Sequence, residues 1–309
     1  MSEAQFIALQ NELFQLFQEG NIARVYPLIE KAEQTFPNRL NKIIFWKACA
    51  YATEHKLTDA LTVLQEGLAK GIWWNPILLT HDPDLKELQA LDEFQTIVSR
   101  CKAIVESTKQ VATSPLFTYG NVRAEIGLFS LHMRGTNAAD FAPYWLDEQT
   151  SQDYFFGFPQ SSQVFGYNAF CWDNQELMLE DLTRTYAEYK AKGNTTEDIL
   201  AGGSQGGKLA IELSLKQTFQ TKGFIAVIPA IQDLSGFERI IAENSRDTVR
   251  GVIITGDQDP FYEKTVQLAE LFKQHGIPCK LITIKGLGHF FPSDFTGLLS
   301  EAVDYVLDR

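Results

Sequence analysis

Ser204 is flanked by glycines in Gly202-Gly203-Ser204-Gln205-Gly206-Gly207. In this chain of 309 residues, this segment is the first candidate for a catalytic residue. An apolar run ends just before this segment, at Ile199-Leu200, and a pattern with helical spacing follows it at 208–215. A strand that turns abruptly into a helix strains the residue at the turn, and neighbouring glycines relieve the crowding. The hydroxyl then projects from the turn near the positive end of the helix. The segment therefore predicts a nucleophilic serine.

A serine hydroxyl becomes a good nucleophile only beside a base, and that base needs an acid to orient it. His289 follows the last predicted strand, within Gly286-Leu287-Gly288-His289, and we predict that it is the base. Two aspartates compete for the acid in Thr255–Pro260, which also follows a predicted strand. We favour Asp259, because its spacing from the preceding glycine lets the loop turn the carboxylate toward a histidine. We expect Asp257 to brace the loop.

Strands and helices alternate over the part of the chain that carries these residues. Continuous Val, Ile and Leu runs between helical patterns predict a mostly parallel sheet covered on both faces, with the reactive groups at the strand ends. On the helix predicted at 174–191, we expect Leu177, Leu179, Leu182 and Tyr186 to form one buried face. The predicted strands lie at 124–131, 154–158, 198–200, 224–228, 251–254 and 281–284.

The first third of the chain contains only helical patterns, at 6–17, 22–36, 43–53, 60–68 and 85–105. The layout of 20–32 recurs at 56–68, a period close to that of tetratricopeptide repeats. A polar stretch and a Thr-Ser-Pro cluster within 107–115 predict a boundary, which gives a helical domain at 1–108 and a catalytic domain at 109–309. The helices would bind a protein partner, mediate self-association or only pack against the next domain.

The composition excludes several classes of function. A net charge of −12 and a pI near 4.9 argue against nucleic-acid binding and against adsorption to anionic membranes. The four cysteines are scattered and predict free thiols, while the five histidines lack metal-ligand spacing, so we expect neither a metal nor another cofactor. No apolar run is long enough to span a bilayer and no secretory signal is visible, so we expect a cytoplasmic protein.

Hydrolysis of an acyl group also needs two backbone N–H donors for the oxyanion of the tetrahedral intermediate. We expect one of them to be the amide of Gln205, the residue after the predicted nucleophile. The other should come from the loop that follows the strand at 124–131, which reads His132-Met133-Arg134-Gly135-Thr136-Asn137.

Together, several motifs resemble the phospholipase/carboxylesterase branch of the α/β-hydrolases, which are esterases and acyl-protein thioesterases. The resemblance covers roughly residues 115–309 and implies a triad of Ser204, Asp259 and His289, with the amides of Arg134 and Gln205 as the oxyanion hole. Members usually have glycine where Met133 stands, so Met133 remains an alternative donor. The motifs are Leu131–Asn137 with Phe141 and Trp145, Pro159–Gln163, Trp172-Asp173 and Gly203–Gly207.

These features predict a carboxylesterase-type serine hydrolase that cleaves small carboxylic esters or thioesters through an acyl-enzyme on Ser204. A serine peptidase of the same fold would use an identical triad. A dienelactone-type hydrolase usually has cysteine at this position, which disfavours it. A helical-repeat binding protein with an inactive hydrolase domain is a third alternative, although an intact triad argues against it.

Overall fold

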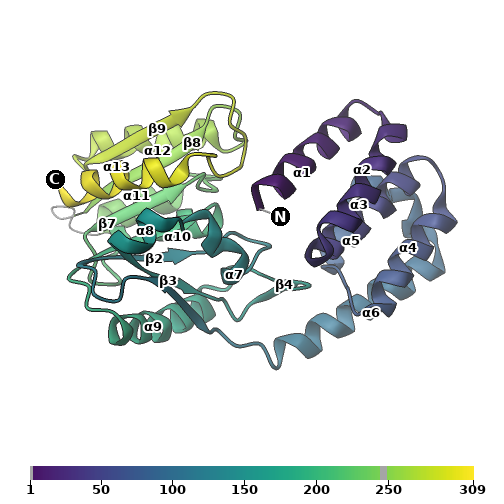
Figure 1. Ribbon diagram of the computed structural model, residues 1–309, viewed down its shortest axis with the longest axis horizontal. Coiled ribbons are helices and arrows are strands. Elements are labelled where there is room, and N and C mark those ends of the chain that lie inside the picture. The colour runs from purple at the N-terminus through teal and green to yellow at the C-terminus, as the bar shows by residue number, and fades with distance from the viewer. Residues whose placement is uncertain (1–2, 244–248) are drawn as a thin grey trace. The chain divides into compact units, whose positions relative to one another are not determined.

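The computed structural model describes residues 3–243 and 249–309, and the chain divides into two compact units (Figure 1). The first unit contains residues 1–111 together with 165–167, and the second contains residues 112–164 and 168–309. Helix α6, Asp92–Lys109, runs across the boundary predicted between residues 108 and 109. That boundary stays a prediction.

The first unit is built from helices, as their apolar stripes predict. Val25 and Ile29 of α2, for example, lie one turn apart and are fully buried in a cluster with Leu13 of α1 and Ile43 of α3. The likeness to tetratricopeptide repeats and a partner for these helices stay predictions. The elements are α1 Glu3–Gln18, α2 Ile22–Thr35, η1 Pro37–Arg39, α3 Leu40–Thr53, α4 Leu57–Ala69, α5 Pro76–His81, η2 Pro83–Ala90 and α6.

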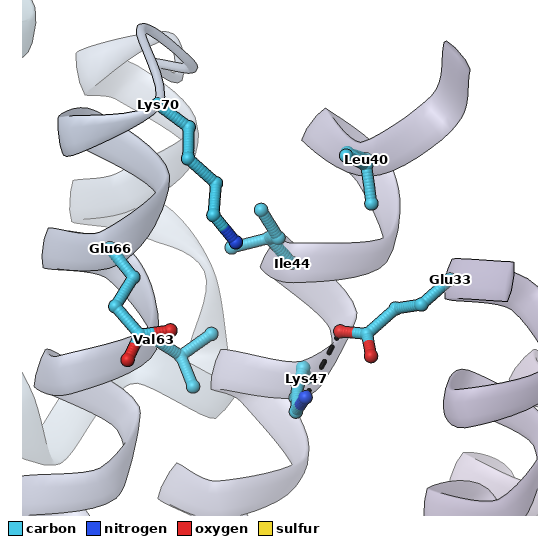
Figure 2. A pocket seen from close by; sticks show the side chains of 7 residues that line it. All are labelled: Glu33, Leu40, Ile44, Lys47, Val63, Glu66 and Lys70. Carbon is cyan, nitrogen blue, oxygen red and sulfur yellow. Dashed lines mark hydrogen bonds and ion pairs between the residues drawn. The ribbon is translucent and has the colours of Figure 1, made fainter. Parts of the chain in front are cut away.

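A cavity of about 240 Å³ opens among helices of the first unit, with its lining on α2, α3 and α4 (Figure 2). The Lys47 Nζ atom of α3 lies 3.0 Å from Glu33 Oε1 of α2, while Glu66 of α4 and Lys70, the residue after α4, complete the charged lining. Charged groups hold their water tightly, so this lining is unsuited to an acyl chain. The apolar part of the lining is Leu40, Ile44 and Val63.

The second unit contains a seven-stranded sheet in the order β1-β3-β2-β6-β7-β8-β9. Strand β1 is antiparallel to β3, and the other pairs are parallel, which confirms the predicted mostly parallel sheet. Two further short strands of the chain, β4 Val164–Gly166 and β5 Ala169–Phe170, lie outside this sheet. The sheet strands are β1 Leu116–Gly120, β2 Ile126–Leu131, β3 Tyr154–Pro159, β6 Glu197–Gly203, β7 Gly223–Val227, β8 Arg250–Gly256 and β9 Cys279–Ile284.

Helices cover both faces of this sheet, because alternate strand residues enter two separate apolar clusters. In β6, Ile199 and Ala201 face α7, η3 and α13, whereas Leu200 faces α9, α10, α11 and α12. The helices are α7 Ala138–Phe141, η3 Ala142–Tyr144, α8 Glu148–Asp153, α9 Gln175–Lys192, α10 Gln205–Leu215, α11 Ser235–Glu243, α12 Tyr262–Gln274 and α13 Phe295–Leu307.

The buried face predicted for α9 is wrong in part. Leu177 and Leu179 are 42% and 44% exposed, whereas Met178, Leu182 and Tyr189 are buried. The observed face follows the 3.6-residue helical period from Met178, and the two exposed leucines flank it on either side. The polar residues Asp181 and Thr185 complete the face, so the apolar pattern alone points to the wrong positions.

None of the helices described is both long and apolar enough to cross a membrane. The cytoplasmic location stays a prediction.

Candidate active site

Ser204 occupies the sharp turn between β6 and α10, with φ 51° and ψ −115°. A positive φ is costly for a residue with a side chain, so the surrounding structure must hold this conformation. Two hydrogen bonds do so: Ser204 N–H donates to Val227 O at 3.0 Å, and Ala230 N–H donates to Ser204 O at 3.1 Å. The end of β7 thus fixes the turn that presents the hydroxyl.

The glycines around the turn permit close backbone approach. A Cβ on Gly206 would lie 2.1 Å from the carbonyl oxygen of Leu131 at the end of β2, and a Cβ on Gly202 would lie 2.5 Å from the backbone of Gly206. Because backbone atoms cannot move aside cheaply, any larger residue would push the turn away from β2. The glycines therefore bring the turn against the loop that follows β2.

The structure brings Ser204, His289 and Asp259 into one hydrogen-bonded line. His289 Nε2 lies 2.8 Å from Ser204 Oγ, and His289 Nδ1 lies 2.7 Å from Asp259 Oδ2. An ionised carboxylate can only accept, so it selects the tautomer with the proton on Nδ1 and leaves Nε2 to accept from the hydroxyl. The Asp259 side chain is buried, and its Oδ1 also accepts from Phe261 N–H at 2.8 Å. This geometry can transfer a proton from the serine.

The competing aspartate, Asp257, lies away from the histidine. Its Oδ1 accepts from Gly286 N–H at 2.7 Å, and Gln258 N–H of the same loop donates to Leu287 O at 3.0 Å. Asp257 thus ties the end of β8 to the loop that carries His289. Of the two aspartates, Asp259 makes the contact with the imidazole.

The two predicted oxyanion residues lie in two different segments, at the start of α10 and in the loop after β2. Gln205 is the first residue of α10, where the helix leaves its first amides without partners inside the helix. Arg134 and Met133 lie in the loop after β2, in which Gly135 has a φ of 79° and Met133 does not have a positive φ. Which of the two loop amides donates stays a prediction.

His132 is the first residue of this loop, and its side chain is fully buried. The sequence motifs did not reveal that it supports the loop from inside. Its Nε2 accepts from Ser161 N–H at 3.2 Å, so the proton resides on Nδ1, which donates to Met133 O at 2.9 Å. The ring also lies 4.7 Å from that of Trp172. Burial lowers the pKa of His132 to about 4, so the ring stays neutral. The segment Pro159–Gln163 therefore supports the loop through Ser161.

The neutral state of His132 predicts a loss of stability in acid. Between its unfolded pKa near 6.5 and its folded pKa near 4, only the unfolded chain gains the proton, so stability falls as pH falls through this window. The difference is worth about 3 kcal/mol in the free energy of unfolding. Urea unfolding of the wild type and of His132→Gln at pH 7 and pH 4.5 would measure it. We expect the free energy of unfolding to fall less between pH 7 and pH 4.5 in the variant than in the wild type. An equal fall in both proteins would contradict the buried neutral imidazole.

The rings of Phe141, Tyr144 and Phe291 pack together beside the nucleophile, and we call them the aromatic wall. A Cβ on Gly203 would lie 2.7 Å from the Phe291 ring and 3.1 Å from the side chains of Met133 and Phe141. The Phe291 ring lies 5.7 Å from that of Phe141 and 4.8 Å from that of Tyr144. Sequence reasoning missed Phe291, although its position two residues after His289 marked it as a neighbour of the site.

Among the described residues, a group of three side chains in the first unit could offer ligand atoms to a metal ion. The ligand atoms of Cys49, Asp82 and Asp84 lie within 4.8 Å of one another. Burial and the two nearby carboxylates raise the pKa of the Cys49 thiol well above its usual range. These three side chains are the whole group, and three protein ligands without a further observation carry no proposal of a metal site.

The chain is similar to several known proteins. Residues 5–109 match the family model described as "A/B hydrolase-like, N-terminal domain". An uncharacterized protein from Bacillus cereus ATCC 10987 is similar along the whole chain, with 26% identity, coverage of 100% of this chain and 99% of that one, and a TM-score of 0.55. The esterase PE8 is 22% identical, with coverage of 62% and 99% and a TM-score of 0.47. No curated protein matches the chain.

A phospholipase/carboxylesterase from Dyadobacter fermentans DSM 18053 is also similar, with 20% identity, coverage of 63% and 97% and a TM-score of 0.45. The sheet order, the turn at Ser204 and the match of the helical residues define an α/β-hydrolase fold preceded by a helical domain. The predicted fold class is confirmed. The Bacillus cereus structure covers both units, so the same combination occurs in a second chain.

Proposed function

We propose that this protein is a serine hydrolase that cleaves carboxylic esters or thioesters through an acyl-enzyme on Ser204. The single observation that carries the proposal is the continuous line from Ser204 Oγ through His289 to Asp259, with contacts of 2.8 and 2.7 Å. A buried carboxylate, an imidazole and a serine at a strained turn are the groups that acyl transfer requires.

In the first half of the reaction, His289 Nε2 takes the Ser204 proton as Oγ attacks the substrate carbonyl carbon. Asp259 stabilises the imidazolium that forms, and the amides of Gln205 and of Arg134 or Met133 donate to the oxyanion. The intermediate then collapses, the bond to the leaving oxygen or sulfur breaks, and His289 gives its proton to that leaving group. The acyl group remains on Ser204.

In the second half, water attacks the acyl-enzyme while His289 accepts its proton, and a second tetrahedral intermediate forms. Its collapse releases the carboxylic acid, and His289 returns the proton to Ser204 Oγ. Atoms balance without a metal or another cofactor, so the chain's own residues suffice for the proposed reaction.

The aromatic wall supports a preference for short acyl groups. Phe291 and Met133 pack against Gly203, directly beside the nucleophile, so a long chain on that side would have to displace them. We expect p-nitrophenyl acetate and butyrate to be turned over faster than the decanoate. Phe291→Ala should raise the relative rate for the longer esters by about tenfold or more, since it removes a whole phenyl ring and even one methylene in an apolar pocket is worth about 1–3 kcal/mol.

The same three p-nitrophenyl esters test the proposed function as a whole when Ser204→Ala is measured beside the wild type. We expect ester turnover that disappears in the variant. Turnover of peptides without turnover of esters would favour a serine peptidase instead. Absence of any Ser204-dependent turnover by the folded wild type would overturn the proposed hydrolase and favour a binding protein.

A further inference from the structure

We propose that Asp173 is a positioning residue that holds both oxyanion donors in register with Ser204, an inference that rests on the proposed function. Asp173 follows Trp172 in the segment between β5 and α9, and belongs neither to the loop after β2 nor to the turn at Ser204. Its carboxylate nevertheless receives hydrogen bonds from the side chains of both Arg134 and Gln205, the residues whose amides we expect to bind the oxyanion.

The contacts of Asp173 form a fork on one side and a single bond on the other. Arg134 Nη2 donates to Asp173 Oδ2 at 2.7 Å and Arg134 Nε donates to Oδ1 at 3.2 Å, which is a bidentate ion pair. Gln205 Nε2 donates to Oδ1 at 2.8 Å. Burial alone would raise the pKa of Asp173, but these hydrogen bonds outweigh it and lower that pKa. The carboxylate is therefore charged at neutral pH.

Trp172 also connects the start of α10 with the loop after β2. Its backbone N–H donates to Gln205 Oε1 at 3.0 Å, and its indole Nε1 donates to His132 O at 3.0 Å. The amide group of Gln205 is thus fixed at both its oxygen and its nitrogen. Together, Trp172 and Asp173 connect the first residue of α10 to both His132 and Arg134 of the loop after β2.

The contacts of Asp173 should affect the placement of the Arg134 amide more than that of the Gln205 amide, because the two amides have unequal backbone support. Gln205 is placed by the start of α10, whereas Arg134 lies in a loop that is held next to it by the Gly135 N–H bond to Phe170 O at 2.8 Å, and sites on loops are held less accurately than sites on helices. A donor must lie 2.7–3.1 Å from the oxyanion to be effective. The fork to the Asp173 carboxylate, which Gln205 Nε2 also holds, restrains the Arg134 backbone that carries the N–H.

A purely structural ion pair would behave differently. The Arg134 and Asp173 side chains are 48% and 46% exposed, and pairs at such positions contribute little to stability. Loss of the pair should therefore lower the rate of the chemical step while leaving the melting temperature nearly unchanged. Removal of Arg134 beyond Cβ leaves its backbone N–H in place, so Arg134→Ala tests the tether separately from the donor.

The experiment compares Asp173→Asn, Arg134→Ala and the double variant on p-nitrophenyl butyrate. We expect each single variant to lower kcat by about 10- to 100-fold with KM changed less than about threefold, since a misplaced oxyanion donor has effects of this size. The double variant should be no slower than the slower single variant, because both changes cut the same tether. Arg134→Lys should fall between Arg134→Ala and the wild type, because it keeps the charge and loses the fork.

A tetrahedral inhibitor gives a second measurement. A trifluoromethyl ketone places an oxyanion where the intermediate has it, so its inhibition constant should rise in Asp173→Asn by the same factor as kcat/KM falls. Glu301→Gln is the matched control, because it neutralises one partner of the similarly exposed ion pair between Lys280 and Glu301 on α13. We expect the wild-type kcat for this variant.

Unchanged kcat in both single variants, beside an active wild type, would overturn the positioning role and leave the hydrolase proposal intact. Losses that multiply in the double variant, or that follow a fall in melting temperature, would also overturn it. A folded wild type without Ser204-dependent turnover would overturn the proposed function and this inference with it.

Discussion

His289→Ala is expected to lower kcat for ester hydrolysis by about five to six orders of magnitude. His289 Nε2 lies 2.8 Å from Ser204 Oγ, and no other imidazole contacts that hydroxyl among the described residues. Without it the serine proton has no acceptor and the leaving group has no proton donor, so both halves of the reaction lose their acid–base catalyst. Triad serines and histidines act as a unit, and loss of either one costs about a millionfold. KM should change little, because the imidazole does not bind the ground state.

The measurement is steady-state hydrolysis of p-nitrophenyl butyrate by wild type and variant. The two proteins are purified separately, because a trace of wild type would mask a loss of this size. The control is His275→Ala, a change of the same residue type at an exposed position after α12. We expect the wild-type rate for this control. Activity of His289→Ala within about a hundredfold of the wild type would show that another group serves as the base.

Asp259→Asn is expected to lower kcat by about 10⁴-fold, whereas Asp257→Asn should lower it by less than about tenfold. The Asp259 carboxylate accepts from His289 Nδ1–H at 2.7 Å and so keeps Nε2 available to the serine. An amide at this position can turn its NH₂ group toward the ring and favour the tautomer that blocks Nε2. The two aspartates lie two residues apart and undergo the same chemical change, so each is the other's matched control.

The smaller effect expected for Asp257→Asn follows from its contacts. Its carboxylate accepts from Gly286 N–H at 2.7 Å, and loss of the charge weakens a brace of the loop rather than the triad. Its consequence should be a modest loss of stability, about 1 kcal/mol in the free energy of unfolding. The rates of both variants and their urea unfolding curves measure the difference. Equal losses of kcat in the two variants would contradict the assignment of Asp259 as the acid.

Much of the site could be predicted because its residues follow strands in a fixed order. A turn rich in glycine after an apolar run places Ser204, and loops after the next strands place Asp259 and His289 near it. The choice between Asp257 and Asp259 depended on loop geometry, and the contact with His289 agrees with the choice that spacing favoured.

The surroundings of the site could not be predicted in the same way. Asp173 lies 39 residues from Arg134 and 32 from Gln205 along the chain, and no periodic pattern connects three polar residues in three separate segments. The buried state of His132 likewise depends on Ser161 and Trp172, which only the folded chain brings together. On α9, Asp181 is buried because it accepts from the Ser162 N–H and hydroxyl, so a charged residue occupies the inner face.

Reaction with a fluorophosphonate probe tests most directly whether Ser204 is an activated nucleophile. The full-length wild type and Ser204→Ala would be incubated with the probe, and intact mass and peptide mapping would give the stoichiometry and the position of the adduct. We expect one adduct per wild-type chain, on Ser204, and none on the variant. A folded wild type that remains unlabelled, or a Ser204→Ala variant that is labelled equally, would contradict the central role of Ser204.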